Sequence, residues 1–351
     1  MTSPPIFPDT CPVPIAEGDV VLLAHGGGGR LTRRLIDRMI VPAFDNELLR
    51  RLHDGAVAPF ADGHLAFTTD SFVVRPLEFP GGDIGTLAVN GTINDLACCG
   101  AVPLYLSCGL ILEEGLPMST LERILQSMRN AAAAAGVEIV TGDTKVVDRG
   151  KGDQIYINTA GIGQVPTGRE IDPRQIREGD AILVSGDIGR HGMAVMAVRE
   201  GLEFEGSITS DCAALHRVVG DLLDDGVEVH CLRDLTRGGL AAALVELAES
   251  GGFRFTIEEA DVPVDEAVRG ASEILGLDPL HVACEGRLVA FVPEPYAERA
   301  LAVMKRHESS RMARRIGTVA APGSGLVVLR TAMGTERILD LPLGELLPRI
   351  C

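Results

Sequence analysis

The chain has 351 residues, enough for two domains on a prior of roughly 100–200 residues each. Hydrophobic residues make up 46% of it, which supports packed cores and excludes a disordered chain. Because Trp is absent and aromatic residues are only 4%, those cores must be built from aliphatic side chains. A net charge of −17 disfavours nucleic acid as a partner, because little on the chain would neutralise a long phosphate track.

Targeting signals are not apparent. No stretch reaches the roughly 18 uncharged apolar residues that a membrane span needs. The first twenty residues carry acidic groups and no basic start, unlike a signal peptide. The eight cysteines contain no Cys-x-x-Cys pair, and the chain is too long for a disulfide scaffold. We therefore expect a cytoplasmic protein with no membrane partner.

Strands and helices alternate in both halves of the chain. A helical arm is expected within residues 1–50, a first domain over 51–168, a second over 169–340, and a proline-containing tail over 341–351. Asp83 is a good N-cap, and Ser119 with Glu122 forms a capping-box pattern. The mixture predicts two α+β (mixed α/β) domains. In chain order we expect strands at 65–70, 104–112, 137–140, 155–162, 181–185, 227–231, 253–257, 287–292 and 325–329, and helices at 30–39, 84–99, 119–135, from 193, at 212–223 and at 239–249.

A glycine run, Ala24 to Arg30, precedes the first predicted helix. Backbone N–H groups at such a position can bind phosphate. The run lacks the Gly-Lys-Ser/Thr of a P-loop and the last glycine of GxGxxG, so a flexible loop is an equal alternative.

Carboxylates stand at strand ends and helix starts: Asp70, Asp83, Asp95 and Asp143. Gathered together they would suit Mg²⁺, which takes oxygen ligands and bridges them to the phosphates of a nucleotide. For any one of them a cap or turn is the commoner explanation. Asp95 is the strongest candidate, because Asn90 and Asn94 share its otherwise apolar helix and such polar groups need partners.

Three further segments place charges beside glycines. Thr144 and Lys145 follow Asp143 in a Gly-Asp-Thr-Lys sequence at a strand end, where the lysine could contact phosphate or move a proton, although most lysines are only surface residues. Asp234, Thr236, Arg237 and Gly238 precede a helix and suit phosphate and metal binding, with a capped helix as the alternative. Glu285 precedes a strand, where a turn glutamate would be the ordinary reading.

The sequence ends on a cysteine, Cys351. Eight cysteines in 351 residues make this a chance event of roughly 2%. The ten residues before it could extend ~33 Å. A thiol on such a tether can be modified at one place and delivered to another.

The Pro-Arg-Ile-Cys ending resembles that of the HypE family of hydrogenase maturation factors. Resemblance extends in order along the chain through 69–72, 82–97, 142–145 and 233–239. These internal motifs are shared with aminoimidazole ribonucleotide synthetase, selenophosphate synthetase and thiamine monophosphate kinase. The terminal cysteine distinguishes HypE from these relatives.

The resemblance implies a two-domain PurM-like fold, in which the N-terminal sheets pair across a homodimer, ATP binds nearby, the C-terminal domain covers the site and the tail is mobile. It implies ATP-dependent dehydration of a carbamoyl group on Cys351 to a thiocyanate. HypF would load the group, and the HypC–HypD complex would receive the product for the cyanide ligands of [NiFe] hydrogenase. Cys351, Glu285 and Lys145 would be catalytic. Mg²⁺ would be held by Asp70, Asp95, Asp143 and Asp234, and the nucleotide by Asp70, Asp83, Asn90, Asn94, Asp95, Thr144, Thr236, Arg237 and Gly238.

Two alternatives stay open. Another enzyme of the same superfamily would act on a free small molecule and leave Cys351 unused. A nucleotide-binding scaffold would bind ATP without chemistry.

Overall fold

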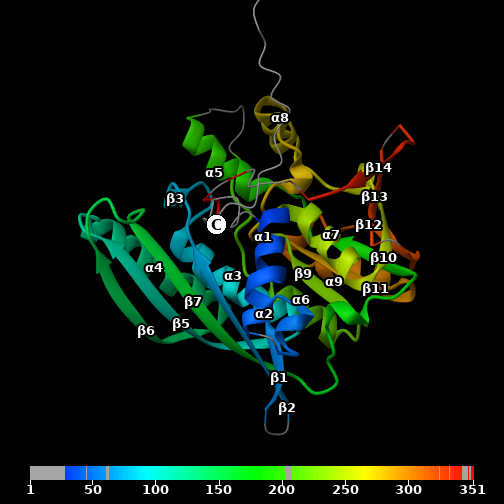
Figure 1. Ribbon diagram of the computed structural model, residues 1–351, viewed down its shortest axis with the longest axis horizontal. Coiled ribbons are helices and arrows are strands. Elements are labelled where there is room, and N and C mark those ends of the chain that lie inside the picture. Colours follow the sequence, from blue (N-terminus) through cyan, green and yellow to red (C-terminus); the bar gives the residue numbers. More distant parts are fainter. Residues whose placement is uncertain are drawn as a thin grey trace, which may run out of the picture.

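The computed structural model describes residues 28–44, 46–60, 63–201, 208–323, 325–331, 333–341, 347 and 349–351. Two large sheets, one in each half of the chain, lie side by side with helices between and around them (Figure 1). The predicted α+β class is therefore confirmed. The arm before Gly28, including most of the glycine run, lies outside the described residues, as do residues 342–346 and 348 of the tail.

The N-terminal sheet has five strands in the order β1-β2-β7-β5-β6. All neighbours are antiparallel except β5 and β6, which are parallel because helix α4 crosses between them. The bounds are β1 Ala56–Phe60, β2 Gly63–Phe72, β5 Val102–Glu113, α4 Met118–Ala135, β6 Glu138–Val147 and β7 Ile155–Val165. A separate pair consists of β3 Glu78–Phe79 and β4 Gly82–Asp83.

Helix α3, Ile84–Cys98, is the central element of the molecule. It is buried over nearly its whole length because it packs on β2 and β7 of the first sheet and also against α6 and β9 of the second half. Its apolar residues therefore lie all round the axis rather than on one stripe. As predicted, Asp83 caps it, in a capping box completed by Thr86.

The second sheet has seven strands in the order β14-β13-β10-β12-β8-β11-β9. Strand β8 is buried on both faces: Ile182 and Val184 pack toward α7, and Ala181 and Leu183 toward α6 and α9. This explains its continuous apolar run. The bounds are β8 Asp180–Val184, β9 Cys231–Asp234, β10 Phe253–Glu258, β11 Leu288–Pro293, β12 Arg314–Pro322, β13 Val327–Arg330, β14 Glu336–Leu339, α5 Arg190–Glu200, α6 His216–Asp224, α7 Gly239–Gly251, α8 Glu266–Leu275 and α9 Ala297–Met304.

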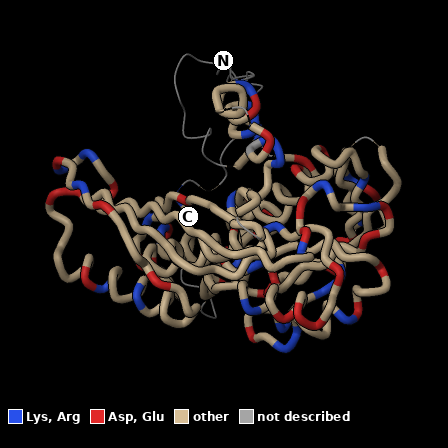
Figure 2. The backbone as a smooth tube through the Cα atoms, turned by 90° about the horizontal axis from the view of Figure 1, so that it is seen from below, with Lys and Arg blue, Asp and Glu red and all other residues tan. Residues whose placement is uncertain are grey.

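Charged residues gather in the outer loops and at the ends of the molecule, whereas the central strands carry few of them (Figure 2). The predicted first helix begins at Arg30 as expected. The remaining short elements are α1 Arg30–Leu35, a π-helical stretch Ile36–Ile40, α2 Val41–Phe44, and 3-10 turns at Leu49–Arg51, Pro173–Gln175, Glu259–Asp261, Pro279–His281, Glu294–Tyr296 and Glu308–Ser310.

Several predicted boundaries were wrong. Helix α4 starts at Met118 with Pro117 at the N-cap and no side-chain cap, so Ser119 and Glu122 form no capping box. The strand predicted at 227–231 forms at Cys231–Asp234 instead, where its residues pair with β11. The edge strands β1 and β14 and helices α8 and α9 were missed, because short edge strands and short helices carry weak periodicity. The interior strand β12 was missed as well.

Candidate active site

Three of the predicted aspartates meet in one cavity of about 280 Å³. Asp70 comes from β2, Asp95 from α3 and Asp234 from the end of β9. A fourth carboxylate, Asp54 just before β1, joins them. Thr236 and Arg237 of the predicted phosphate segment line the same cavity, together with Gly28 of the glycine run. Segments far apart in the sequence thus form one acidic pocket between the two domains.

The pocket carries a concentration of negative charge. Loss of water contact raises the pKa of Asp95 well above its usual value, and the charges of Asp234, Asp70 and Asp54 raise it further. Burial is also the first cause of the raised pKa of Asp70 and of Asp234. Thr68 donates a hydrogen bond of 2.7 Å to Asp95, which partly offsets the effect. The carboxylates therefore favour protons or cations around them.

Asp54 is partly neutralised. Arg233 donates a hydrogen bond of 2.6 Å to Asp54 Oδ1, whereas Asp54 Oδ2 is buried without a hydrogen-bond partner. Oxygen donors of this kind suit Mg²⁺. Among the described residues, however, no three acidic, histidine or cysteine side chains are already spaced to ligate one ion. The donor chemistry fits magnesium, and the ion remains a prediction.

Cys351 lies beside this pocket. Its thiol lies beside the Glu285 side chain, which is buried. Burial raises the pKa of Glu285 well above the usual value, and the charges of Asp234 and Asp211 add to the effect. Burial first, and then the charge of Glu285, likewise raise the pKa of the Cys351 thiol. The unloaded thiol is therefore held neutral.

Arg237 links the thiol to the acidic pocket. The pKa of Arg237 is raised, first by its interaction with Cys351 and then by Asp70, Glu285 and Asp234. Its backbone is packed closely by Gly28, where a Cβ atom would come within 2.9 Å of the Arg237 carbonyl oxygen. Only glycine fits there, at φ +73°. Gly238 follows as the N-cap of α7 in the left-handed region, at φ +80°.

Asp143, Thr144 and Lys145 lie elsewhere in the same chain. They belong to β6, the outermost strand, and Lys145 Nζ binds Asp143 Oδ2 at 2.6 Å on the surface. That pairing is the first cause of the lowered pKa of Asp143. Asp70 lies opposite Thr159, Thr159 opposite Cys108, and Cys108 opposite Gly142.

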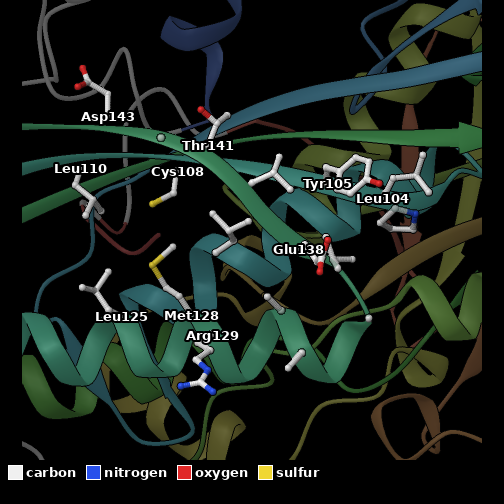
Figure 3. A pocket seen from close by; sticks show the side chains of 18 of the residues that line it. Leu104, Tyr105, Cys108, Leu110, Leu125, Met128, Arg129, Glu138, Thr141 and Asp143 are labelled. Carbon is white, nitrogen blue, oxygen red and sulfur yellow. The ribbon is translucent and has the colours of Figure 1, made fainter.

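These registers place β2 and β6 three strand spacings apart, or about 14 Å. Within one chain Asp143 therefore cannot share an ion with Asp70, which corrects the predicted grouping. Lys145 likewise lies on the edge strand of the N-terminal sheet, whereas Glu285 precedes β11 of the second sheet. Asp143 and Thr144 instead line a larger cavity of about 1360 Å³ between β5, β6 and α4, in which Cys108 and Met128 also lie (Figure 3).

The other predicted ligands already have protein partners. Asp83 caps α3 and accepts a short hydrogen bond from Ser127. Asn94 donates to the carbonyl of Ala213 at 3.0 Å and accepts from the amide of Leu215 at 2.8 Å, tying the domains together. Asn90 lies within 3.5 Å of the sulfur of Cys212. The hydrogen bonds of Asp83 and Asn94 serve to cap α3 and to link the two domains, respectively.

Sequence reasoning missed Asp54 as part of the pocket, and also the residues that hold the tail. Asp54 precedes a glycine and a short edge strand, which resembles an ordinary turn. Asp54 comes near the pocket because the strand after it, β1, pairs with β2, the strand that carries Asp70.

Known families match both halves. The model described as AIR synthase related protein, N-terminal domain, matches residues 52–165, and the C-terminal domain model matches residues 177–329. A relative from Cupriavidus necator named carbamoyl dehydratase HypE is 50% identical over 341 residues, which is 97% of both chains. One of the same name from Escherichia coli is 46% identical and covers 94% of this chain and 99% of its own. The chain belongs to the HypE family.

Solved structures agree with HypE membership. A HypE–HypF complex matches with a TM-score of 0.83 and 47% identity, over 88% of this chain and 99% of that one. HypE in complex with ATP matches with a TM-score of 0.80 and 48% identity, over 95% of this chain and all of that one. The resemblance predicted from the tail and the internal motifs is confirmed. In the described part of the chain, no helix is long and apolar enough to cross a membrane.

Proposed function

We propose that this protein uses ATP to dehydrate a carbamoyl group carried on its own Cys351, leaving a thiocyanate on the same sulfur. The contact between the Cys351 thiol and Glu285, beside a cavity lined by carboxylates and Arg237, carries the proposal. The names of the relatives and the ATP complex of a family member support it.

The reaction balances in two steps. The carbonyl oxygen of the S-carbamoyl group takes the γ-phosphoryl group of ATP, which gives ADP, and one N–H proton is released. The remaining N–H proton is then removed as the C–O bond breaks. Phosphate leaves, and the carbon and nitrogen are joined by a triple bond. Phosphorylation is needed because an amide-like oxygen is a poor leaving group.

Glu285 is the proposed base. Its carboxyl group lies beside the Cys351 thiol, and Oε1 is buried without a hydrogen-bond partner in the described structure. A carbamoyl group on the sulfur would bring its N–H within reach of the same carboxylate. Burial raises the pKa of Glu285, which makes its carboxylate a stronger base than an exposed glutamate.

The acidic pocket is the proposed place of the nucleotide's phosphates. Thr236, Arg237 and Gly238 supply hydroxyl, guanidinium and backbone groups at the start of α7. Asp70, Asp95 and Asp234 would hold Mg²⁺, which neutralises phosphate charge when it is bound. Arg237 also lies near Cys351, so it can orient the reacting oxygen.

A homodimer through the N-terminal sheet is part of the proposal. Strand β6 is a long edge strand whose residues are exposed on both faces, and it carries apolar side chains such as Val140 and Val146. Tyr105 and Ile111 of neighbouring β5 are exposed as well. Long apolar edges of this kind normally pair with another chain. The predicted roles of Asp143 and Lys145 would then need a second copy.

The partners follow from the family. HypF would load the carbamoyl group, consistent with the solved HypE–HypF complex of a relative. The HypC–HypD complex would take the thiocyanate for the cyanide ligands of [NiFe] hydrogenase, in the cytoplasm. The domains proposed for these tasks are 51–168 for nucleotide, metal and dimer contacts and 169–340 as the cover, with residues 341–351 as the carrier tail.

Mass spectrometry tests the proposal. The protein is incubated with HypF, carbamoyl phosphate and ATP, and the peptide that ends at Cys351 is weighed over time. We expect a carbamoyl adduct followed by loss of one water, and neither change in Cys351→Ser. A carbamoyl adduct that stays intact while ATP is bound would instead favour the scaffold. Consumption of a free small molecule by protein shortened to Ile350 would favour a different synthetase.

A further inference from the structure

The last residues of the chain are held like a short added strand. The amide of Val73 donates to the carbonyl of Cys351 at 3.2 Å, and the amide of Arg75 donates to the carbonyl of Arg349 at 3.2 Å. Residue numbers rise along 73–75 as they fall along the tail from 351 to 349, so the two segments run in opposite directions, as in an antiparallel ladder. Side chains add to this, because Arg349 forms an ion pair of 2.9 Å with Asp153. The first domain thus supplies one wall of the docking site.

Helix α5 supplies the opposite wall. The Nε2 atom of His191 lies 2.6 Å from the Ile350 carbonyl oxygen. Two turns further along, Arg199 donates to the carbonyl of Arg349 at 2.7 Å, and also to that of Arg75. One arginine therefore ties both strands of the added ladder together.

Apolar contacts complete the docking site. Ile350 and Leu347 are buried in the core cluster shared by the two domains. Gly192 of α5 lets Leu347 come close. A Cβ atom on residue 192 would lie 3.2 Å from the Cδ1 atom of Leu347. The chain turns at Arg349, which has φ +56°. A residue with a side chain rarely adopts this conformation, so contacts on both sides must maintain it.

The hydrogen bonds define the protonation of His191. A carbonyl oxygen can only accept, so Nε2 must carry a proton. The ring is buried, with Phe79 packed edge-on at 5.1 Å, and burial lowers its pKa. A neutral ring leaves Nδ1 as an acceptor for the hydroxyl of Ser210 at 2.9 Å. Ser210 thus fixes the tautomer that donates to the tail.

We propose that His191 and Arg199 are positioning residues for the reaction, which hold the backbone of residues 349 and 350 so that the Cys351 thiol stays against Glu285. Neither side chain touches the sulfur in its described contacts, and each binds the tail through a main-chain carbonyl. The inference rests on the proposed function, because a docked thiol matters only if the chemistry takes place on Cys351.

Thiol alkylation measures the docking without any catalysis. When a docked thiol is shielded, its alkylation rate follows the fraction of molecules in which the tail is released. The full-length protein is treated with iodoacetamide, and cleavage after Glu345 gives a peptide, residues 346–351, that reports on Cys351 alone. His191→Met removes the donor, whereas His191→Gln keeps an N–H near the Nε2 position. Val198→Ala is the matched control, because this side chain is 45% exposed on the same helix.

We expect His191→Met to be alkylated about 3–10 times faster than wild type, the effect of losing one neutral hydrogen bond. His191→Gln and Val198→Ala should stay near the wild-type rate. The double variant His191→Met/Arg199→Met should react faster still and should dehydrate a preloaded carbamoyl group at least about tenfold more slowly in a single turnover, because it loses charge-assisted bonds as well.

Unchanged alkylation in the double variant would overturn the inference, and so would an equal increase in Val198→Ala. Faster alkylation of the double variant with a normal rate of dehydration would also overturn it, because docking would then not position the reaction. If wild type fails to form thiocyanate while the alkylation rates change as expected, the proposed function fails and the docking role of His191 and Arg199 stands.

Discussion

The Cys351 thiol lies beside the buried Glu285 side chain, and this contact places the last residue of the sequence between the two domains. Burial raises the pKa of both groups. The same arrangement would allow Glu285 to take a proton from a nitrogen carried on that sulfur.

Glu285→Gln should therefore separate binding from chemistry. We expect the single-turnover rate of dehydration to fall by about 10²–10⁴-fold, the usual contribution of a general base. ATP affinity, measured by calorimetry, should be unchanged, because Glu285 is not among the residues that line the acidic cavity. The exposed Glu298→Gln on α9 is the control. Thiocyanate formed by Glu285→Gln at the wild-type rate would remove Glu285 from the mechanism.

Asp95→Asn should stabilise the metal-free protein in a pH-dependent way. The pKa of Asp95 is raised in the folded state, so the unfolded chain loses this proton first as pH rises above 3.8. The wild-type fold then loses stability until the pH passes the folded pKa. Thermal melting should show a gain for Asp95→Asn that grows as the pH rises above 3.8 and levels off once it passes the folded pKa, at roughly 1–2 °C for each kcal/mol relieved.

The exposed Asp148→Asn serves as the control for that series and should show no such trend. A gain for Asp95→Asn that is greatest at pH 4 would have the wrong sign, and would mean that the carboxylate is stabilised rather than strained in the fold.

Magnesium should stabilise the wild-type protein by binding to the acidic pocket. An ion at about 100 times its dissociation constant adds roughly 2.7 kcal/mol to the free energy of unfolding. Asp70→Asn and Asp234→Asn should each lose most of the increase in melting temperature, whereas Asp148→Asn should keep it. Equal increases in wild type and in both pocket variants would place the ion elsewhere.

Lys145 should act from the second subunit if it acts at all, because β6 is the strand farthest from β2 in the sheet. We expect Lys145→Ala alone to form thiocyanate slowly. Mixed dimers of Lys145→Ala with Cys351→Ser should regain activity on the Lys145→Ala chain, since its partner supplies the lysine. Mass spectrometry of that chain's last peptide checks this, with Lys151→Ala as the control. No recovery in verified mixed dimers would exclude a role across the interface.

The sequence by itself determined much of the local structure. Apolar runs and caps predicted the main strands and helices, because backbone hydrogen bonding and the burial of one face act over a few neighbouring residues. The cap at Asp83 is an example, since the aspartate and Thr86 are three residues apart. The family also followed from the sequence, because the order of motifs and the final cysteine are properties of the chain itself.

Only the tertiary structure decided which of the marked residues meet. Asp70 and Asp143 both stood at predicted strand ends, yet strand order puts Asp143 on the far edge of the sheet. Asp54 gave almost no signal, and it enters the pocket because β1 pairs with β2. His191 and Arg199 read as ordinary residues of α5 until the tail is seen against them. Contacts of this kind depend on how distant segments pack, and periodicity within a short window carries no information about that packing.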